Sequence, residues 1–292
     1  MVGRIKPLLP GIISQEQGAF VAGRNISHNV MLAQEMMWDL QRASKRRSLM
    51  VVKLDMERAY DRIRWSFLRR ALEAYGFHRR WIGWGAWRGF SDAWVLRRVL
   101  AGYCAASGQR VNFMKSAIQF SPSTETRVIL EIRRILQIPE QEGTLVYLGV
   151  PITGRRLRVT ECSGLVRRVE SRLEGWRASS LSMMERLTLV RLVLGSMPIY
   201  LMANTVVPKT TLLKIERLLR SFLWGSHGGG HGVHLVAWEQ VCLSISEGGL
   251  EVQSLLERRE ALIARHAARF LLEPQGLWSR VMAARYGRGG SE

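Results

Sequence analysis

Apolar residues recur at intervals of three or four positions along much of this 292-residue chain, and this spacing constrains its fold more than any other feature. Such stripes predict amphipathic helices that each bury one face. The pattern is clear from Ile26 to Leu40 and dominates beyond Val95, so we expect a mostly helical α+β protein. The stripes comprise Ile26, Val30, Ala33, Met37 and Leu40; Trp65, Leu68, Leu72 and Tyr75; Leu165, Val169, Leu173 and Trp176; Leu187, Val190 and Leu194; Leu212, Ile215, Leu219 and Phe222; and residues along 252–272.

A mostly apolar run at 49–54 lacks the helical period and predicts a buried strand. Gly76 stands where the C-terminus of a helix favours glycine, and Thr160 can cap the helix that follows it. Ser182 and Glu185 have the spacing of a capping box. Three tryptophans at apolar helical positions are expected in the core: Trp65, Trp176 and Trp224.

Positive charge is in large excess along the whole chain. Lysines and arginines number 43 against 24 acidic residues, which gives a formal net charge of +19 and a pI near 11.1. This excess favours a polyanionic partner, with nucleic acid as the first candidate. The alternative is that arginine-rich helix faces are simply solvated.

The three cysteines, Cys104, Cys162 and Cys242, are odd in number and widely spaced. They indicate neither a disulfide framework nor a cysteine-based zinc site. No apolar stretch approaches the roughly 18 residues that a membrane span requires, and the N-terminus lacks the pattern of a signal peptide. We therefore expect a nuclear or cytoplasmic protein without a membrane partner.

Asp55 comes directly after the predicted strand, where a carboxylate held at a sheet edge can ligate a divalent cation. Phosphoryl transfer by two metal ions requires a second carboxylate, so one aspartate is not sufficient. By themselves, the residue types also allow Asp55 to be a surface or capping residue, Asp61 to be an N-cap and Tyr60 to be a core aromatic.

Several longer sequence segments resemble the reverse transcriptase of plant LINE-type retrotransposons. They are QGAFVAGRNISHNVMLAQE at 17–35, VVKLDMERAYDRIRWSFLRRALEAYGF at 51–77, YCAASGQRVNFMKSAIQFS at 103–121, YLGVPI at 147–152 and LEGWRASSLSMMERLTLVRLVLGSMPIYLM at 173–202. The resemblance implies an RNA-directed DNA polymerase that uses Mg²⁺ and binds RNA, DNA or an RNA–DNA hybrid.

The resemblance also implies roles for single residues. Asp55 matches the first catalytic aspartate of the palm, a ligand of both magnesium ions, and Met56 would offer only its backbone carbonyl. Tyr60 matches the bulky residue that blocks a ribonucleotide 2′-hydroxyl. Arg24 lies in a fingers motif where a basic residue could approach the template or the incoming triphosphate. His28 stands where an aspartate is usual.

Two motifs of the family are absent here: a Gly-Gln-Gly-Asp-Pro-like motif and an Ala-Asp-Asp motif. The Ala-Asp-Asp motif supplies the other metal ligands. Asp92 does not replace them, and the Gly- and Trp-rich stretch at 83–94 is the expected deletion junction. We expect a partial fingers–palm region at 1–90, with unpaired edges on the 49–54 strand, and a helical thumb-like and post-thumb region at 95–290. The chain would then be catalytically incomplete; the alternative is a non-enzymatic basic nucleic-acid-binding remnant or a pseudogene product.

Two other features could form sites. His227, His231 and His234 have a spacing that could bind zinc, but the three glycines between the first two disfavour a helix that presents both. The basic helices expected at 164–177 and 254–272 could line a nucleic-acid duplex, or they could be solvated faces.

Overall fold

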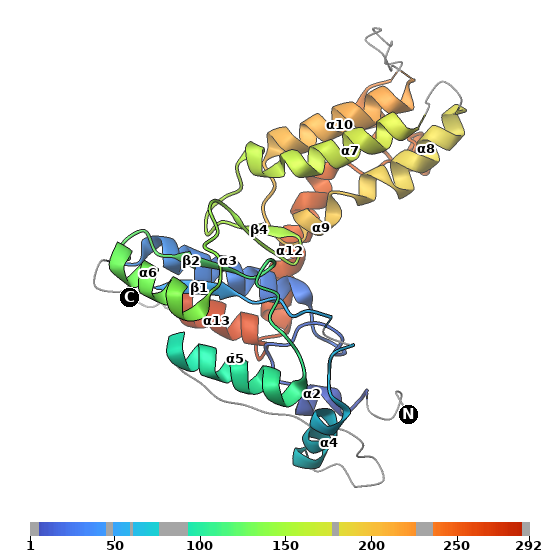
Figure 1. Ribbon diagram of the computed structural model, residues 1–292. Coiled ribbons are helices and arrows are strands. Elements are labelled where there is room, and N and C mark those ends of the chain that lie inside the picture. Colours follow the sequence, from blue (N-terminus) through green and yellow to red (C-terminus); the bar gives the residue numbers. More distant parts are fainter. Residues whose placement is uncertain are drawn as a thin grey trace. The chain divides into compact units, whose positions relative to one another are not determined.

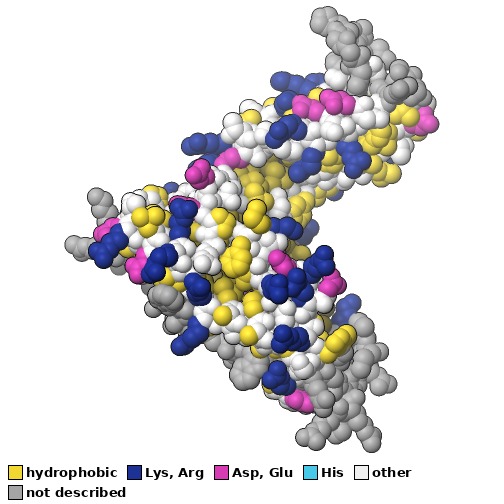
Figure 2. All heavy atoms as spheres, in the orientation of Figure 1, with side chains coloured by type: hydrophobic (Ala, Val, Ile, Leu, Met, Phe, Trp, Pro, Cys, Tyr) yellow, Lys and Arg dark blue, Asp and Glu magenta, His cyan; other side chains and the backbone are white. Residues whose placement is uncertain are grey.

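The computed structural model describes residues 6–44, 49–58, 61–75, 93–176, 181–225 and 236–287. Within these ranges the fold is mostly helical with two small sheets, which confirms the expected fold class (Figure 1). Lysine and arginine side chains are spread over the visible face, with acidic side chains between them (Figure 2). Among the helices that the structure describes, none is long and apolar enough to cross a bilayer.

The chain forms two compact units. The first comprises Met1–Arg24, Ala33–Tyr147 and Ile152–Gly154, and the second comprises Asn25–Leu32, Leu148–Pro151 and Arg155–Glu292. Helix α3 (Ile26–Arg42) and strand β4 (Val150–Ile152) therefore contribute residues to both units. The division into fingers–palm and thumb-like regions rests on the family motifs and stays a prediction.

The first unit contains a two-stranded antiparallel sheet. Strand β1 (Met50–Lys53) confirms the predicted strand, although its residues are only half-buried. It pairs with β2 (Ala117–Phe120) in a register that runs from Met50 opposite Phe120 to Lys53 opposite Ala117. The expectation that β1 exposes both edges is thus wrong for one edge, because a strand that the sequence did not reveal covers it.

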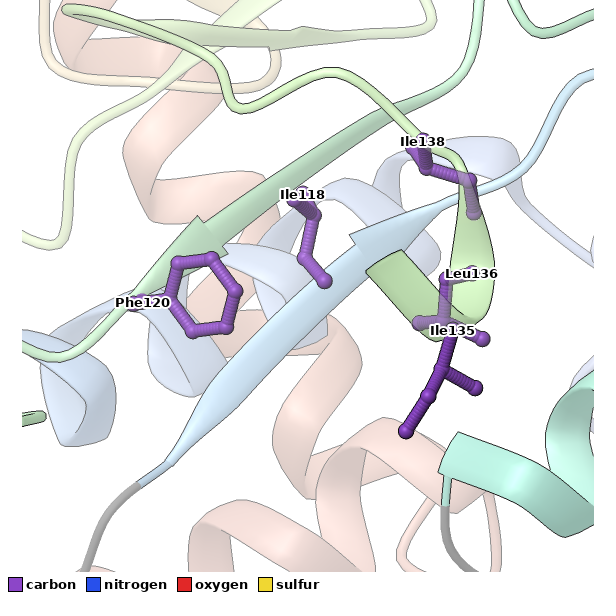
Figure 3. Close-up of a cluster of buried hydrophobic side chains, with 5 residues drawn as sticks. All are labelled: Ile118, Phe120, Ile135, Leu136 and Ile138. Carbon is purple, nitrogen blue, oxygen red and sulfur yellow. The ribbon is translucent and has the colours of Figure 1, made fainter. Parts of the chain in front are cut away.

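Beyond this sheet, the first unit contains α2 (Leu9–Ile12), α4 (Trp65–Ala74), α5 (Ala93–Ser107), α6 (Thr126–Leu136) and β3 (Leu145–Tyr147). The core packs around β2 and the end of α6. Figure 3 shows the buried side chains of this cluster: Ile118, Phe120, Ile135, Leu136 and Ile138. Met50 and Val52 of β1 pack against this cluster, which explains why a short strand stays in place.

Helix α4 is confirmed, but its buried face differs from the predicted stripe. Trp65 is 69% exposed, so its assignment to the core is wrong. Phe67 is buried instead, and its ring packs edge-on against Tyr103 of α5 with centroids 5.8 Å apart. The Arg64 N–H donates to the Ser107 carbonyl at the start of the helix, and this bond fixes which face turns inward.

The N-cap of α4 is Arg64, whose side chain makes no capping bond. The interpretation of Asp61 as an N-cap is therefore wrong. Asp61 instead lies in a turn and donates its backbone N–H to the Arg58 carbonyl at 3.0 Å. Gly76 lies outside the described residues.

The second unit is built from helices. They are the short η1 (Val159–Cys162), α7 (Ser163–Gly175), α8 (Met183–Leu192), η3 (Leu194–Ser196), α9 (Ile199–Met202), α10 (Lys209–Leu223), α11 (Trp238–Cys242), η4 (Ile245–Glu247), α12 (Leu255–Leu272) and α13 (Leu277–Tyr286). Helix α10 packs against α7, α8 and α12. Its predicted stripe from Leu212 to Phe222 is confirmed, because all four members are buried.

Hydrogen bonds between side chains and backbone cap the N-termini of helices in this unit. The Ser182–Glu185 capping box is confirmed, with the Ser182 N–H donating to Glu185 Oε2 at 2.7 Å. The Thr160 cap is wrong, because Glu161 accepts the Arg158 N–H at 2.7 Å and Thr160 lies inside η1. Trp176 and Trp224 are half-buried. The sequence did not reveal α13.

Candidate functional site

Asp55 follows β1, and two long-range hydrogen bonds fix its backbone. Its N–H donates to Ser116 Oγ at 3.0 Å, and its carbonyl accepts the Asn112 N–H at 2.8 Å. Ser116 is buried and Asp55 is half-buried. The placement of Asp55 just beyond a strand is therefore confirmed, whereas its catalytic role stays a prediction.

The residues after Asp55 run antiparallel to 110–112. Met56 pairs with Val111 in an isolated bridge, and the Glu57 N–H donates to the Arg110 carbonyl at 2.9 Å. The two hydrogen bonds that flank the bridge do not use the Met56 carbonyl. This carbonyl is the atom that the family resemblance assigns to the nucleotide site, and that role stays a prediction.

A two-ion centre for phosphoryl transfer needs at least two carboxylates around the ions. Across the described ranges, no group of three or more Asp, Glu, His or Cys side chains could hold a metal ion. The acidic residue nearest to Asp55 in sequence is Glu57, whose carboxylate pairs with Arg62 at 3.1 Å. The described donors therefore do not fit a pair of Mg²⁺ ions.

Some residues singled out in the sequence lie outside the described part of the chain. They are Tyr60, Asp92, His227, His231 and His234. The role predicted for Tyr60, the expectation that Asp92 is not a metal ligand and the zinc site considered for the three histidines all stay predictions.

Arg24 has a structural role that the sequence did not indicate. Its guanidinium donates to the carbonyls of Pro10 at 3.0 Å, Ile13 at 2.7 Å and Gln17 at 3.0 Å, and also to that of Ser14. A planar group with five N–H donors suits such a set of converging acceptors. These bonds hold the loop around α2. The predicted approach of Arg24 to template or nucleotide stays a prediction.

Replacing Arg24 by alanine should lower the unfolding free energy of the first unit by about 2 kcal/mol, because the charged hydrogen bonds to four carbonyls are lost together. Arg24→Lys should recover only part of this loss, since a single ammonium cannot reach all four acceptors. Urea unfolding of the three proteins provides the comparison. Equal stability of the wild type and Arg24→Ala would contradict the structural role.

The second unit contains a cluster of rings around the buried Trp278. His28 of α3 stacks on Trp278 of α13 with centroids 5.1 Å apart, and His266 and Phe270 of α12 contact the same indole edge-on. His266 Nε2 lies 2.8 Å from the Ala203 carbonyl. That contact requires the proton on Nε2 in the neutral imidazole, so Nδ1, which is buried without a protein partner, carries the lone pair.

The charge of both histidines is disfavoured in the folded state. Burial lowers the pKa of His28, and Arg269 lowers it further, against a smaller opposite effect of Glu273. Burial also lowers the pKa of His266; the Ala203 carbonyl opposes this, while Arg265 and Arg269 add to it.

These shifts predict that the second unit becomes less stable in mild acid. Near pH 8, well above the ordinary histidine pKa of 6.5, both states carry neutral imidazoles and stability should change little with pH. Below pH 6.5 the unfolded chain binds protons that the folded chain does not, so the unfolding free energy should fall. Urea unfolding down to about pH 5.5, above the range where carboxylates titrate, measures this slope. His28→Gln should make the slope shallower; an unchanged slope would contradict this assignment.

A cavity of about 400 Å³ lies in the first unit, close to the segment that follows Asp55. Helix α5, the segment 110–113 and the end of α6 form its walls. Its apolar lining comprises Leu100, Ala101, Val111, Phe113 and Leu136. The sequence did not reveal this cavity, since its lining, which also includes Glu57, comes from four separate parts of the chain that share no motif.

Exposed basic side chains occur on two helices of the second unit that pack together, α7 and α10. We call this set the α7–α10 surface: Arg167, Arg168, Arg172, Lys209, Lys214 and Arg217. One ion pair, Lys214 with Glu170 at 2.9 Å, joins the two helices. The basic helix expected at 164–177 is thus confirmed as a helix with exposed arginines.

Comparison with known proteins adds independent information, although no family model matches the chain. A putative ribonuclease H protein of Arabidopsis thaliana is 37% identical over 137 residues, 47% of this chain and 22% of that protein. The transposon TX1 uncharacterized 149 kDa protein of Xenopus laevis is 23% identical over 370 residues, 97% of this chain and 27% of that protein. These similarities support a transposon-derived protein. An uncharacterized mitochondrial protein of Arabidopsis thaliana is 29% identical over 92 residues, 31% of this chain and 60% of its own length.

The transposon-derived chain spans only about a quarter of the first two of these relatives. The alignment with the Xenopus protein is also longer than the chain itself. The matched 97% of 292 residues corresponds to about 283 residues, so about 87 of the 370 aligned positions have no residue of this chain opposite them.

Proposed function

We propose that this chain derives from the reverse transcriptase of a LINE-type retrotransposon and binds RNA, DNA or an RNA–DNA hybrid without polymerising by itself. The observation that carries the proposal is the formal net charge of +19, part of which is exposed on the α7–α10 surface. Arginine forks suit phosphate oxygens, and a protein with this charge excess attracts a polyanion over long distances.

Two further observations support the descent. The quoted sequence motifs resemble those of that family and occur in the same order as in the family. A transposon protein also aligns over 97% of the chain. The roughly 87 aligned positions without a residue of this chain agree with the loss of a segment, which the missing Ala-Asp-Asp motif also implies. Without that segment, the described carboxylates around Asp55 do not fit a two-ion centre.

Binding should depend steeply on salt, because each neutralised phosphate releases counterions. For a protein that contacts about four phosphates, affinity should fall roughly a hundredfold between about 50 and about 200 mM salt. Fluorescence anisotropy with a labelled duplex and a labelled hybrid measures this slope. If the protein does not bind, or if its binding does not depend on salt, the proposal is wrong and a pseudogene product is favoured.

A matched pair of variants tests where binding occurs. Changing Arg167, Arg168 and Arg172 to glutamine should weaken binding and flatten the slope by about 1–3, roughly one per lost phosphate contact. The control changes Arg98, Arg127 and Arg134, which are exposed on helices of the first unit. Equal losses in both triple variants would show that total charge, not the α7–α10 surface, governs affinity.

A second candidate is RNA-directed DNA polymerase activity, which the position of Asp55 just beyond β1 favours. Primer extension with magnesium and all four deoxynucleotides tests it directly. Incorporation that Asp55→Ala abolishes would establish this candidate and overturn the non-catalytic proposal. We expect no incorporation by either protein.

A further inference from the structure

The cavity beside the Asp55–Glu57 segment has the dimensions of a small-ligand site. Its volume of about 400 Å³ falls in the range usual for such pockets. Asp55 and Met56 do not line it, so it is separate from the carboxylate that the family resemblance singles out. Leu100, Ala101 and Leu136 give it apolar walls.

One wall carries an aromatic ring that solvent can reach. Phe113 lines the cavity and is 48% exposed, so part of its surface is available to a flat partner. Stacking of a nucleic-acid base on an aromatic side chain tolerates any sequence, because every base has a π-face. Gln137, on the same lining, supplies an amide that can both donate to and accept from a base edge.

The remaining lining residues make the local charge positive. Arg97 and Arg110 are exposed and belong to the lining. Arg97 Nη1 donates to the Ile135 carbonyl at 2.5 Å, which holds the guanidinium at the end of α6 while further N–H donors remain on the group. Arg62 offsets the single acidic residue, Glu57, at 3.1 Å.

We propose that this cavity takes one unstacked base of a single-stranded nucleic acid, with Phe113 stacked on the base and Arg97 and Arg110 contacting the adjacent phosphates. The inference rests on the nucleic-acid binding proposed above and adds a preference for single strands. Base-paired nucleic acid does not enter the cavity, because its bases remain stacked within the duplex.

Neighbouring residues provide a matched pair of variants. Phe113→Ala removes the stacking ring, whereas Met114→Ala removes a side chain that is 93% exposed and does not line the cavity. With a labelled single-stranded oligothymidylate, Phe113→Ala should weaken binding by roughly 5- to 100-fold, the range seen when stacking platforms are truncated. Met114→Ala should bind like the wild type, and all three proteins should bind a duplex equally.

Cys104 also lines the cavity and provides a second measurement. Burial raises the pKa of the Cys162 thiol, and burial with nearby Glu216 raises that of Cys242 to about 12, so both should alkylate slowly. Saturating oligothymidylate should therefore slow iodoacetamide labelling at Cys104, located by mass spectrometry, whereas duplex should not.

The outcomes separate the two proposals. Duplex binding that persists while Phe113→Ala and Met114→Ala bind single strands alike would overturn the cavity inference alone. Labelling of Cys104 that oligothymidylate leaves unchanged would also overturn that inference. Loss of all binding, to duplex and single strand together, would overturn both proposals. Circular dichroism of each variant shows whether it has folded, and Phe113→Leu repeats the test without emptying the site.

Discussion

Phe222→Ala should lower the unfolding free energy of the second unit by about 3–5 kcal/mol. Phe222 is fully buried on α10, the helix that packs against α7, α8 and α12. Its ring also lies 5.9 Å from that of Trp176, centroid to centroid. Truncation removes the transfer free energy of the ring and leaves a cavity that three helices cannot close together.

Urea unfolding followed by far-ultraviolet circular dichroism measures this loss. Phe222→Leu is the matched control, because it keeps an apolar side chain in the same position and should cost clearly less. A loss below about 1 kcal/mol for Phe222→Ala would mean that α10 is not the centre of a packed core.

Gly154→Ala should lower the unfolding free energy of the first unit by about 3–4 kcal/mol. Gly154 has φ +58°, a left-handed conformation that costs an L-residue about 1–2 kcal/mol. An added Cβ would also lie 2.5 Å from the Trp38 nitrogen and 2.6 Å from the Met37 carbonyl carbon. Both neighbours are backbone atoms of α3, which cannot turn aside as a side chain would.

Gly143→Ala separates the two contributions. Gly143 has φ +83°, yet no atom lies within 4 Å of the added Cβ. It should therefore show only the conformational cost of about 1–2 kcal/mol. Equal losses at Gly143 and Gly154 would show that α3 does not approach Gly154 as closely as the structure has it.

The long helices were predictable because their apolar stripes repeat over several turns. The stripe from Leu212 to Phe222 is buried as the spacing indicates. β2 has four residues and β3 and β4 three each, too few to establish an alternation against a helical background. The buried face of α4 escaped prediction for another reason: contacts of Arg64 and Phe67 with α5, distant in sequence, decide it.

In the candidate site, too, some features could be predicted from the sequence and others could not. The position of Asp55 was predictable because a strand end is a local feature. The four acceptors around Arg24 are backbone carbonyls, which every residue carries, so no residue type announces them. The cavity depends on the packing of α5 and α6 beside the segment 110–113, and only the tertiary fold brings these together.

The sharing of α3 between the two units has a consequence for how the protein can be cut. A fragment that starts at Arg155 would lack Asn25–Leu32, and with it the imidazole of His28 that covers one face of the Trp278 indole. Neither unit is therefore a contiguous piece of chain. N-terminal truncation or proteolysis that removes Asn25–Leu32 but spares all the helices from α7 onward still removes part of the core those helices share, so the second unit depends on sequence that precedes the first unit's own sheet.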